Sequence, residues 1–141
     1  MSAGTDWKAK WREELERELK DNILHYWMTR TVDEKNGGFI GRIGDDRQPD
    51  YEAAKSLVLN TRILWTFSAA YRVFKDDRYL AVAERAYGYV TDKFADREYG
   101  GFYWMVDAQG SPLEDKKQVY GQAFAIYALS EFYRAARRKE A

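Results

Sequence analysis

Cysteine is absent from this 141-residue chain, so disulfides and thiolate metal sites are excluded. No apolar run is long enough to span a bilayer, and the first residues, MSAGTDWKAKWREELEREL, contain no apolar stretch typical of a signal peptide. Acidic and basic residues are equal in number, 23 of each, so no basic surplus points to nucleic acid or an anionic membrane. We therefore predict a soluble, cytoplasmic protein with neither partner.

Four segments have the apolar periodicity of helices. The first and third are amphipathic, whereas the second and fourth carry apolar or small residues on most faces and are predicted to be buried. The second nevertheless contains one permanently charged side chain, Arg62. The first predicted helix covers about 6–30, and the second begins between 51 and 56 and ends near 75. The third covers 76–94 and the fourth 118–138.

A seven-residue motif occurs twice, 63 residues apart, as DEKNGGF at 33–39 and as DREYGGF at 96–102. Each copy follows an amphipathic helix and precedes a short apolar segment, a turn and an apolar helix. Such internal repetition is typical of stacked helical units that share a core. Two units would leave an unpaired flank on each side.

The repeat predicts an all-α fold in which amphipathic helices lie outside and apolar helices lie inside. We expect one domain over residues 1–141, with repeat units at about 6–75 and 76–138. Short β-hairpins are predicted in the loops, the first of them beginning with a strand at about 39–43.

Three stretches carry a resemblance to a known family: NGGFIGRI, LVLNTRILWTFSAAYR and GGFYWMVDAQGSPLEDKKQVYGQAFAIYALSEFYRA. Over about 19–136 the chain closely resembles the N-terminal third of the N-acylglucosamine 2-epimerase family, particularly its members that act on cellobiose. The resemblance implies an (α/α)6 barrel of twelve helices around a central sugar pocket. This chain would supply four of the twelve, as two αα-hairpins.

The resemblance also implies a reaction that interconverts glucose and mannose at the reducing end of β-1,4-linked disaccharides. It implies a disaccharide or monosaccharide substrate and no cofactor, neither metal nor nucleotide. Removing the C2 proton needs bases with pKa values near neutral. A fixed cation would stabilise the resulting cis-enediolate.

The same resemblance assigns roles to individual residues. Arg62 matches the position of the stabilising cation, and Tyr120 matches a catalytic-pocket tyrosine that contacts the sugar. Phe124 lies one turn beyond Tyr120 and Tyr127 lies at i+7, so both could stack on a pyranose ring. Asn60 is a weaker candidate for substrate binding.

The residues alone leave other interpretations open. Arg62 could be a structural arginine paired with a carboxylate, and Tyr120 and Phe124 could be core residues. The only histidine, His25, lies on the predicted outer helix, so we do not expect it to be catalytic.

The family's catalytic histidines belong to the later two thirds of its barrel, so we expect the 141 residues alone to be inactive. Three explanations follow: a fragment, a unit that self-associates through open barrel flanks, or a short non-catalytic binding or scaffold module. Convergence of Arg62, Tyr120 and Phe124 on one face would favour a partly formed sugar site.

Overall fold

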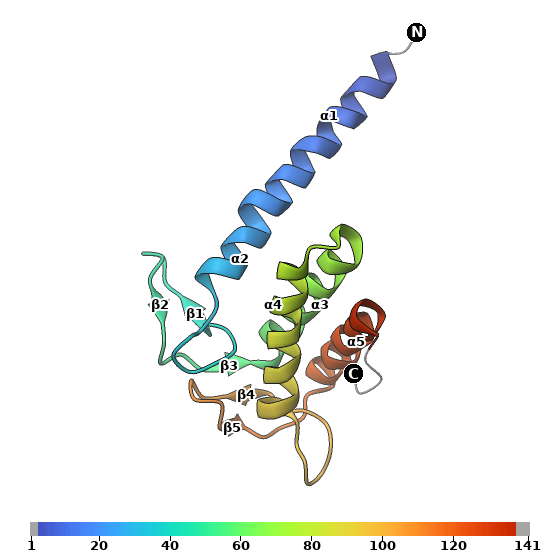
Figure 1. Ribbon diagram of the computed structural model, residues 1–141. Coiled ribbons are helices and arrows are strands. Elements are labelled where there is room, and N and C mark those ends of the chain that lie inside the picture. The colour runs from blue at the N-terminus through green and yellow to red at the C-terminus, as the bar shows by residue number, and fades with distance from the viewer. Residues whose placement is uncertain (1–2, 138–141) are drawn as a thin grey trace. The chain divides into compact units, whose positions relative to one another are not determined.

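A computed structural model describes residues 3–137 (Figure 1). The chain forms two units that join between Val32 and Asp33, and each is described by itself. Its helical stretches number four in the described part, as the sequence predicts.

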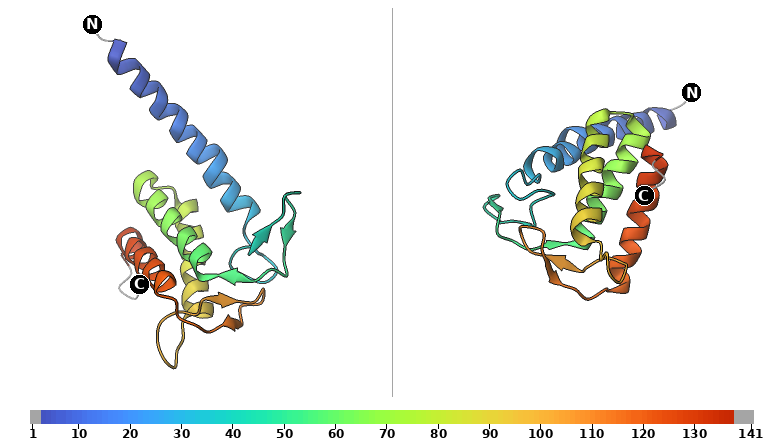
Figure 2. Two further views of the ribbon diagram at one scale, coloured as in Figure 1. Left: turned by 180° about the vertical axis from the view of Figure 1, so that it is seen from behind. Right: turned by 60° about the horizontal axis from the view of Figure 1, so that its bottom comes forward.

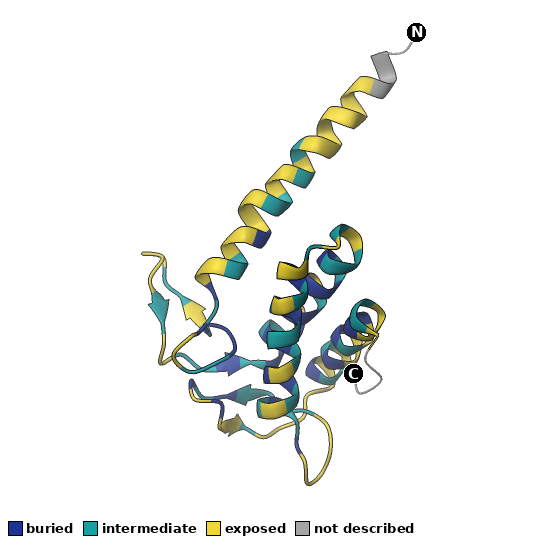
Figure 3. Cartoon of the chain, viewed as in Figure 1, coloured by how far each residue is buried: buried dark blue, intermediate teal, exposed yellow. Residues whose placement is uncertain are grey.

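The first unit is one long helical stretch. It consists of α1 (Ala3–Arg17), a π-helical segment η1 (Glu18–Leu24) and α2 (His25–Arg30). The helix predicted over 6–30 is confirmed and begins three residues earlier, whereas the π-helical segment was not predicted. Most of α1 is exposed, as the yellow ribbon in Figure 3 shows.

Three helices dominate the second unit. They are α3 (Leu57–Phe74), α4 (Asp77–Tyr89), which continues as the π-helical segment η2 (Val90–Phe94), and α5 (Val119–Ala136). In every view α3 lies between α4 and α5 (Figures 1 and 2). The apolar character of α3 follows from this position, because it is covered by helices on two sides.

The helix ends follow ordinary capping chemistry. The Ser56 side chain accepts a hydrogen bond from the Leu59 amide at the start of α3, and the Asp76 side chain accepts one from the Arg78 amide at the start of α4. Both α3 and α5 end at a residue in the left-handed region, Lys75 with φ 57° and Arg137 with φ 58°. The last predicted residue of the fourth helix, Arg138, lies outside the described residues.

Short antiparallel strands connect the helices. β1 (Arg42–Ile43) pairs with β2 (Pro49–Asp50), so the predicted strand at 39–43 is confirmed over its last two residues. A second sheet has the order β3-β4-β5, formed by β3 (Lys55–Ser56), β4 (Met105–Val106) and β5 (Pro112–Glu114). β3 was not predicted, and its pairing with β4 joins the two copies of the repeat.

One part of the core of the second unit lies where α3, the end of α4 and β4 meet. The buried cluster there contains Leu57, Tyr89, Val90, Phe94 and Val106. Four of these residues come from helices and one from the sheet, so the sheet closes one end of the helical core.

The prediction that the apolar helices are buried on most faces is wrong in part. On α3, Arg62 and Thr66 are exposed. α5 has α3 as its main helical neighbour, which leaves much of its apolar surface uncovered in the described residues. The large exposed residues of α5 are Val119, Tyr120, Ile126, Tyr127 and Tyr133.

Across residues 3–137, no helix combines the length and the apolar character that crossing a membrane would require.

Candidate functional site

Arg62 lies on an exposed face of α3, although its sequence neighbours Thr61 and Ile63 are buried. Successive residues of a helix point in different directions, so one charged residue can reach the surface of a largely apolar helix. The charge in α3 therefore does not have to be buried.

Arg62 contacts one of the aromatic residues predicted for the site, and that residue contacts a second. Its guanidinium carbon, Cζ, lies 5.5 Å from the centroid of the Phe124 ring, within the range of a cation–π interaction. The Phe124 ring lies 4.9 Å from that of Tyr120, tilted by 58°. Tyr120 is exposed, and Phe124 is half-buried between its two neighbours. Packing of α3 against α5 thus brings three predicted residues together.

A second aromatic pair lies one turn further along both helices. Trp65 and Tyr127 stack nearly parallel, with ring centroids 5.1 Å apart and planes 10° from each other. Trp65 follows Arg62 by three residues and Tyr127 follows Phe124 by three, so each shares a helix face with the earlier residue. Trp65 was not predicted, although its spacing from Arg62 could have indicated it.

We call the group formed by Arg62, Trp65, Tyr120, Phe124 and Tyr127 the Arg62 face. It combines one cation with four aromatic rings, three of which carry a polar hydroxyl or indole N–H. Such surfaces suit a polyhydroxylated ligand, because rings pack on C–H faces while donors and the cation meet its oxygens.

Arg62 has no carboxylate within ion-pair distance among the described residues. Arg72, ten residues later on the same helix, is different: its Nε donates to Oε1 of Glu131 over 2.6 Å. Arg134 donates to the other oxygen of the same nearly buried carboxylate. Arg72 therefore has the structural role considered for Arg62, whereas the charge of Arg62 is uncompensated by any carboxylate.

Asn60 does not join the Arg62 face. It is fully buried, and its Nδ2 donates to the carbonyl oxygen of Ser56 over 2.9 Å. Its Oδ1 is also buried and accepts no hydrogen bond from the described residues. Such a side chain can support α3 from within but cannot contact a ligand on the exposed face.

Close approach of the two helices depends on Gly121. A Cβ atom at this position would come within 3.0 Å of the Leu57 Cδ2 atom and 3.2 Å of the Trp104 Cε3 atom. The absence of a side chain therefore lets the first turn of α5, which carries Tyr120, approach the first turn of α3.

Proton-transfer and metal-binding groups are sparse. His25 is exposed on α2, in the first unit. Within the described residues, no three side chains of the metal-ligating types come together.

The second unit is that of an α/α-repeat protein with a candidate ligand surface. This class follows from the helical repeat with its short antiparallel loop strands, and the ligand surface is the aromatic face with one cation. The N-acylglucosamine 2-epimerase family profile matches residues 38–141. Cellobiose 2-epimerase of Bacteroides fragilis is 49% identical over 130 residues, which are 92% of this chain and 33% of that protein. The chain belongs to the N-acylglucosamine 2-epimerase family.

Solved structures agree with this assignment. The cellobiose 2-epimerase of Spirochaeta thermophila superposes with a TM-score of 0.92 at 37% identity, covering 99% of this chain and 34% of that one. A D-mannose isomerase superposes with a TM-score of 0.76 at 25% identity, covering 86% and 30%. The predicted fold class, part of an (α/α)6 barrel, is confirmed. The chain spans about a third of the length of the curated relatives it matches.

Proposed function

We propose that this chain contributes the cation and part of the sugar-binding wall of a sugar 2-epimerase. The reaction would interconvert glucose and mannose at the reducing end of a β-1,4-linked disaccharide such as cellobiose. The observation that carries the proposal is the guanidinium of Arg62, which lies among aromatic rings without a carboxylate partner in the described residues. A cytoplasmic location stays a prediction from the sequence.

Epimerisation at C2 creates negative charge that Arg62 would stabilise. A base removes the C2 proton of the open-chain aldehyde, and the electron pair moves to the carbonyl oxygen to form a cis-enediolate. The proton then returns to the opposite face of C2, which restores the aldehyde with inverted configuration. A fixed guanidinium interacts more strongly with the developing oxyanion in the transition state than with the neutral carbonyl of the ground state. This difference lowers the activation barrier.

The aromatic residues would hold the sugar in position next to the Arg62 guanidinium. Tyr120, with its ring exposed, can donate a hydrogen bond from its hydroxyl to a sugar oxygen, and Phe124 can pack against a pyranose ring. Cation–π contact with Phe124 also orients the Arg62 guanidinium before the substrate arrives. Asn60 would act only indirectly, by supporting α3.

The bases are expected elsewhere in the barrel. The Arg62 face contains no histidine or carboxylate, and the chain's only histidine lies in the first unit. We therefore expect the 141 residues alone to leave cellobiose unchanged. Product above that of a heat-killed control would contradict this expectation.

A chimera tests the role of Arg62 in a complete barrel. Residues 19–136 would replace the matching third of the Bacteroides fragilis cellobiose 2-epimerase, and glucosyl-mannose formation from cellobiose would be measured. Arg62→Met should lower kcat by about 10²–10³-fold, the usual effect of removing one donor to an oxyanion. Arg42→Met removes another exposed arginine, from β1, and serves as the control.

The proposal fails if the Arg62→Met chimera keeps a kcat within twofold of the Arg42→Met control. The products also distinguish the reaction type, because aldose–ketose isomerisation passes through the same enediolate and would yield a ketose. Ketose as the main product would assign the chain to an isomerase instead.

A non-catalytic sugar-binding module is the second candidate, favoured by the exposure of Tyr120 and Tyr127. It requires the chain alone to bind sugar. Titrating the full chain with cellobiose while following tryptophan fluorescence would report on its five tryptophans, and the part of the change that Trp65→Phe removes would report on Trp65. Millimolar or tighter binding that Arg62→Met abolishes, together with an inactive chimera, would favour this alternative.

A further inference from the structure

The C-terminal ends of α3 and α5 carry the same basic pattern. Each helix ends with a tyrosine, an arginine directly after it, and a basic residue three positions later in the left-handed conformation. The two ends lie side by side (Figure 2), so the repeat gathers four cations at one end of the helix pair. The residues are Tyr71, Arg72 and Lys75 on α3, and Tyr133, Arg134 and Arg137 on α5.

A hollow lies among these cations. Its volume is about 370 Å³, near the lower end of the range of about 300–1,000 Å³ for small-molecule pockets. All the charged side chains that line it are basic, so it would attract an anion. Its wall is formed by Arg72, Lys75, Tyr133, Arg134, Ala135 and Arg137.

One buried carboxylate orients the two arginines. Glu131 is 4% exposed, and its two oxygens accept hydrogen bonds from Arg72 Nε over 2.6 Å and from Arg134 Nη1 over 2.9 Å. Ala69 stands at the matching position of α3, so this carboxylate is not part of the repeated pattern. Both guanidinium groups are therefore held in place before a ligand arrives, which lowers the entropic cost of binding it.

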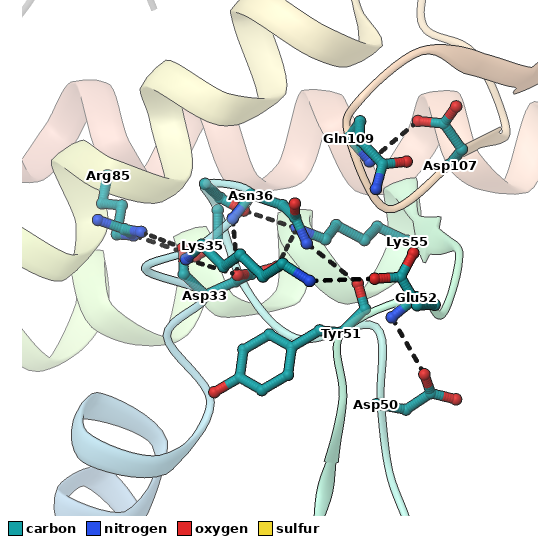
Figure 4. Close-up of polar contacts among 12 residues, drawn as sticks. Asp33, Lys35, Asn36, Asp50, Tyr51, Glu52, Lys55, Arg85, Asp107 and Gln109 are labelled. Carbon is teal, nitrogen blue, oxygen red and sulfur yellow. Dashed lines mark hydrogen bonds and ion pairs between the residues drawn. The ribbon is translucent and has the colours of Figure 1, made fainter.

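The pairing with Glu131 leaves most of the guanidinium N–H groups unused. No described residue accepts a hydrogen bond from Nη1 or Nη2 of Arg72, or from Nε or Nη2 of Arg134. Arg85 on α4 is different, because its Nε and Nη2 donate to two backbone carbonyl oxygens (Figure 4). The donors that Arg72 and Arg134 keep form planar forks, and such forks match the oxygens of a phosphate group.

The positive charge around the hollow exceeds what the fold neutralises. Lys75 and Arg137 make no ion pair with a carboxylate of the described residues. Asp76 and Asp77 do not line the hollow, and Asp76 pairs with Arg78. The four cations face one carboxylate and two helix C-termini, each of which is equivalent to about half a negative charge. The surplus of about two positive charges matches a phosphate monoester, which carries about −1.5 to −2 at pH 7.

We propose that this basic end of α3 and α5 is a binding site for a phosphate group, either inorganic phosphate or the phosphate of a sugar phosphate. Arg72 and Arg134 would donate hydrogen bonds to the phosphate oxygens. Lys75 and Arg137 would supply the remaining charge, and the exposed ring of Tyr133 would lie against the organic part of a sugar phosphate.

The proposed phosphate site is separate from the Arg62 face and needs none of its chemistry. Arg72 follows Arg62 by ten residues on α3, which corresponds to about 15 Å along the helix axis. Both sites nevertheless belong to the same helix pair. A phosphate bound across the C-terminal ends should stabilise the packing of α3 on α5, because a ligand that binds only the folded state favours it.

Titration of the full chain with inorganic phosphate tests the proposal. Chloride would hold the ionic strength at about 0.15 M throughout, so that general screening stays constant. The NMR signals of the Arg72 and Arg134 Nε–H groups should shift in a saturable way, with a dissociation constant of about 1 mM or less. The melting temperature should rise with phosphate concentration.

Two matched variants locate the site. Arg137 and Arg47 are both exposed arginines in the left-handed conformation, with φ 58° and 61°, and neither pairs with a described carboxylate. Arg137→Met should weaken phosphate binding about tenfold, because it removes one charge-assisted contact. Arg47→Met, in the β1–β2 loop, should leave the dissociation constant within twofold of the unsubstituted chain. Neither substitution touches Glu131, so the buried carboxylate keeps its partners.

Three results would overturn the proposal: Nε–H shifts that are not saturable below about 10 mM phosphate, shifts that added chloride reproduces, or equal weakening by Arg137→Met and Arg47→Met. Glucose 6-phosphate distinguishes the two sources of the phosphate group. Tighter binding than that of inorganic phosphate, with the difference removed by Tyr133→Leu, supports a sugar phosphate. Equal or weaker binding supports inorganic phosphate as the ligand.

Discussion

At the scale of single residues, the two lysine–aspartate ion pairs, Lys55–Asp33 and Lys117–Asp96, differ in how far water reaches them. Asp33 and Lys55 are both almost completely buried, and the carboxylate also accepts hydrogen bonds from the amides of Lys35 and Asn36. Burial alone would raise the pKa of Asp33, but Lys55 and these amides lower it below its ordinary value. Burial, followed by the Asp33 charge, raises the pKa of Tyr89 to about 12.

Removing Lys55 should therefore be far more damaging than removing its counterpart. Lys55→Met leaves the Asp33 carboxylate buried without its cation, which typically costs about 3–5 kcal/mol. Lys117→Met should cost clearly less, because water can reach the partly exposed site. Urea denaturation of both variants checks this, and equal losses would contradict the role of burial.

Acid stability should depend on Asp96. The hydrogen bond from Lys117, followed by the Tyr99 amide, lowers its pKa to about 2, below the ordinary value of about 3.9 in an unfolded chain. The folded state is therefore favoured above about pH 4, and this contribution disappears as pH falls from there to about 2. Asp96→Asn should lower the urea midpoint at pH 7 and reduce its further fall between pH 4 and 2.5. An unchanged fall would contradict this assignment.

At the scale of elements, the contact between α3 and α5 decides whether the Arg62 face exists. Arg62 and Trp65 belong to one helix, and their partners Phe124 and Tyr127 belong to the other. Gly121 sets how closely the helices approach near the start of α5.

Widening this contact should disrupt both stability and the site. Gly121→Val would press against Leu57 and Trp104, and overpacking of this kind costs about 1–3 kcal/mol. Gly88→Val on α4 is the matched control, because an added Cβ there meets no atom within 4 Å. Thermal denaturation should show a loss for Gly121→Val alone, and tryptophan fluorescence should change because Trp104 lies against Gly121 and Trp65 lies in the same helix contact. Similar melting temperatures would show that the close approach is not required.

At the scale of the whole molecule, the sequence predicted which segments are helical. It predicted less well the short strands and π-helical segments beside them. The duplicated Gly-Gly motif and the apolar periodicity predicted four helices and two repeat copies. They could not predict β3, because two residues of strand leave no periodic pattern and depend on a partner about 50 residues away. The π-helical segments η1 and η2 also had no recognisable signal.

The predicted site was likewise correct for some residues and not for others. Arg62, Tyr120 and Phe124 were predicted together, and the structure brings them together. Asn60 was a weaker candidate from the same resemblance, but a two-residue step on a helix turns its side chain into the core. Trp65 was not predicted, although it follows Arg62 by three residues on the same helix, and its stack on Tyr127 forms only when α3 and α5 pack together.

The sequence by itself determined which segments are helical, where the loops turn and which residue types can do chemistry, because these depend on local spacing and backbone preference. Only the tertiary structure decided which side chains meet and which stay exposed. Arg62 reaches Phe124, and α5 keeps an uncovered flank, because packing between segments distant in the chain assigns each helix face a neighbour or leaves it to water.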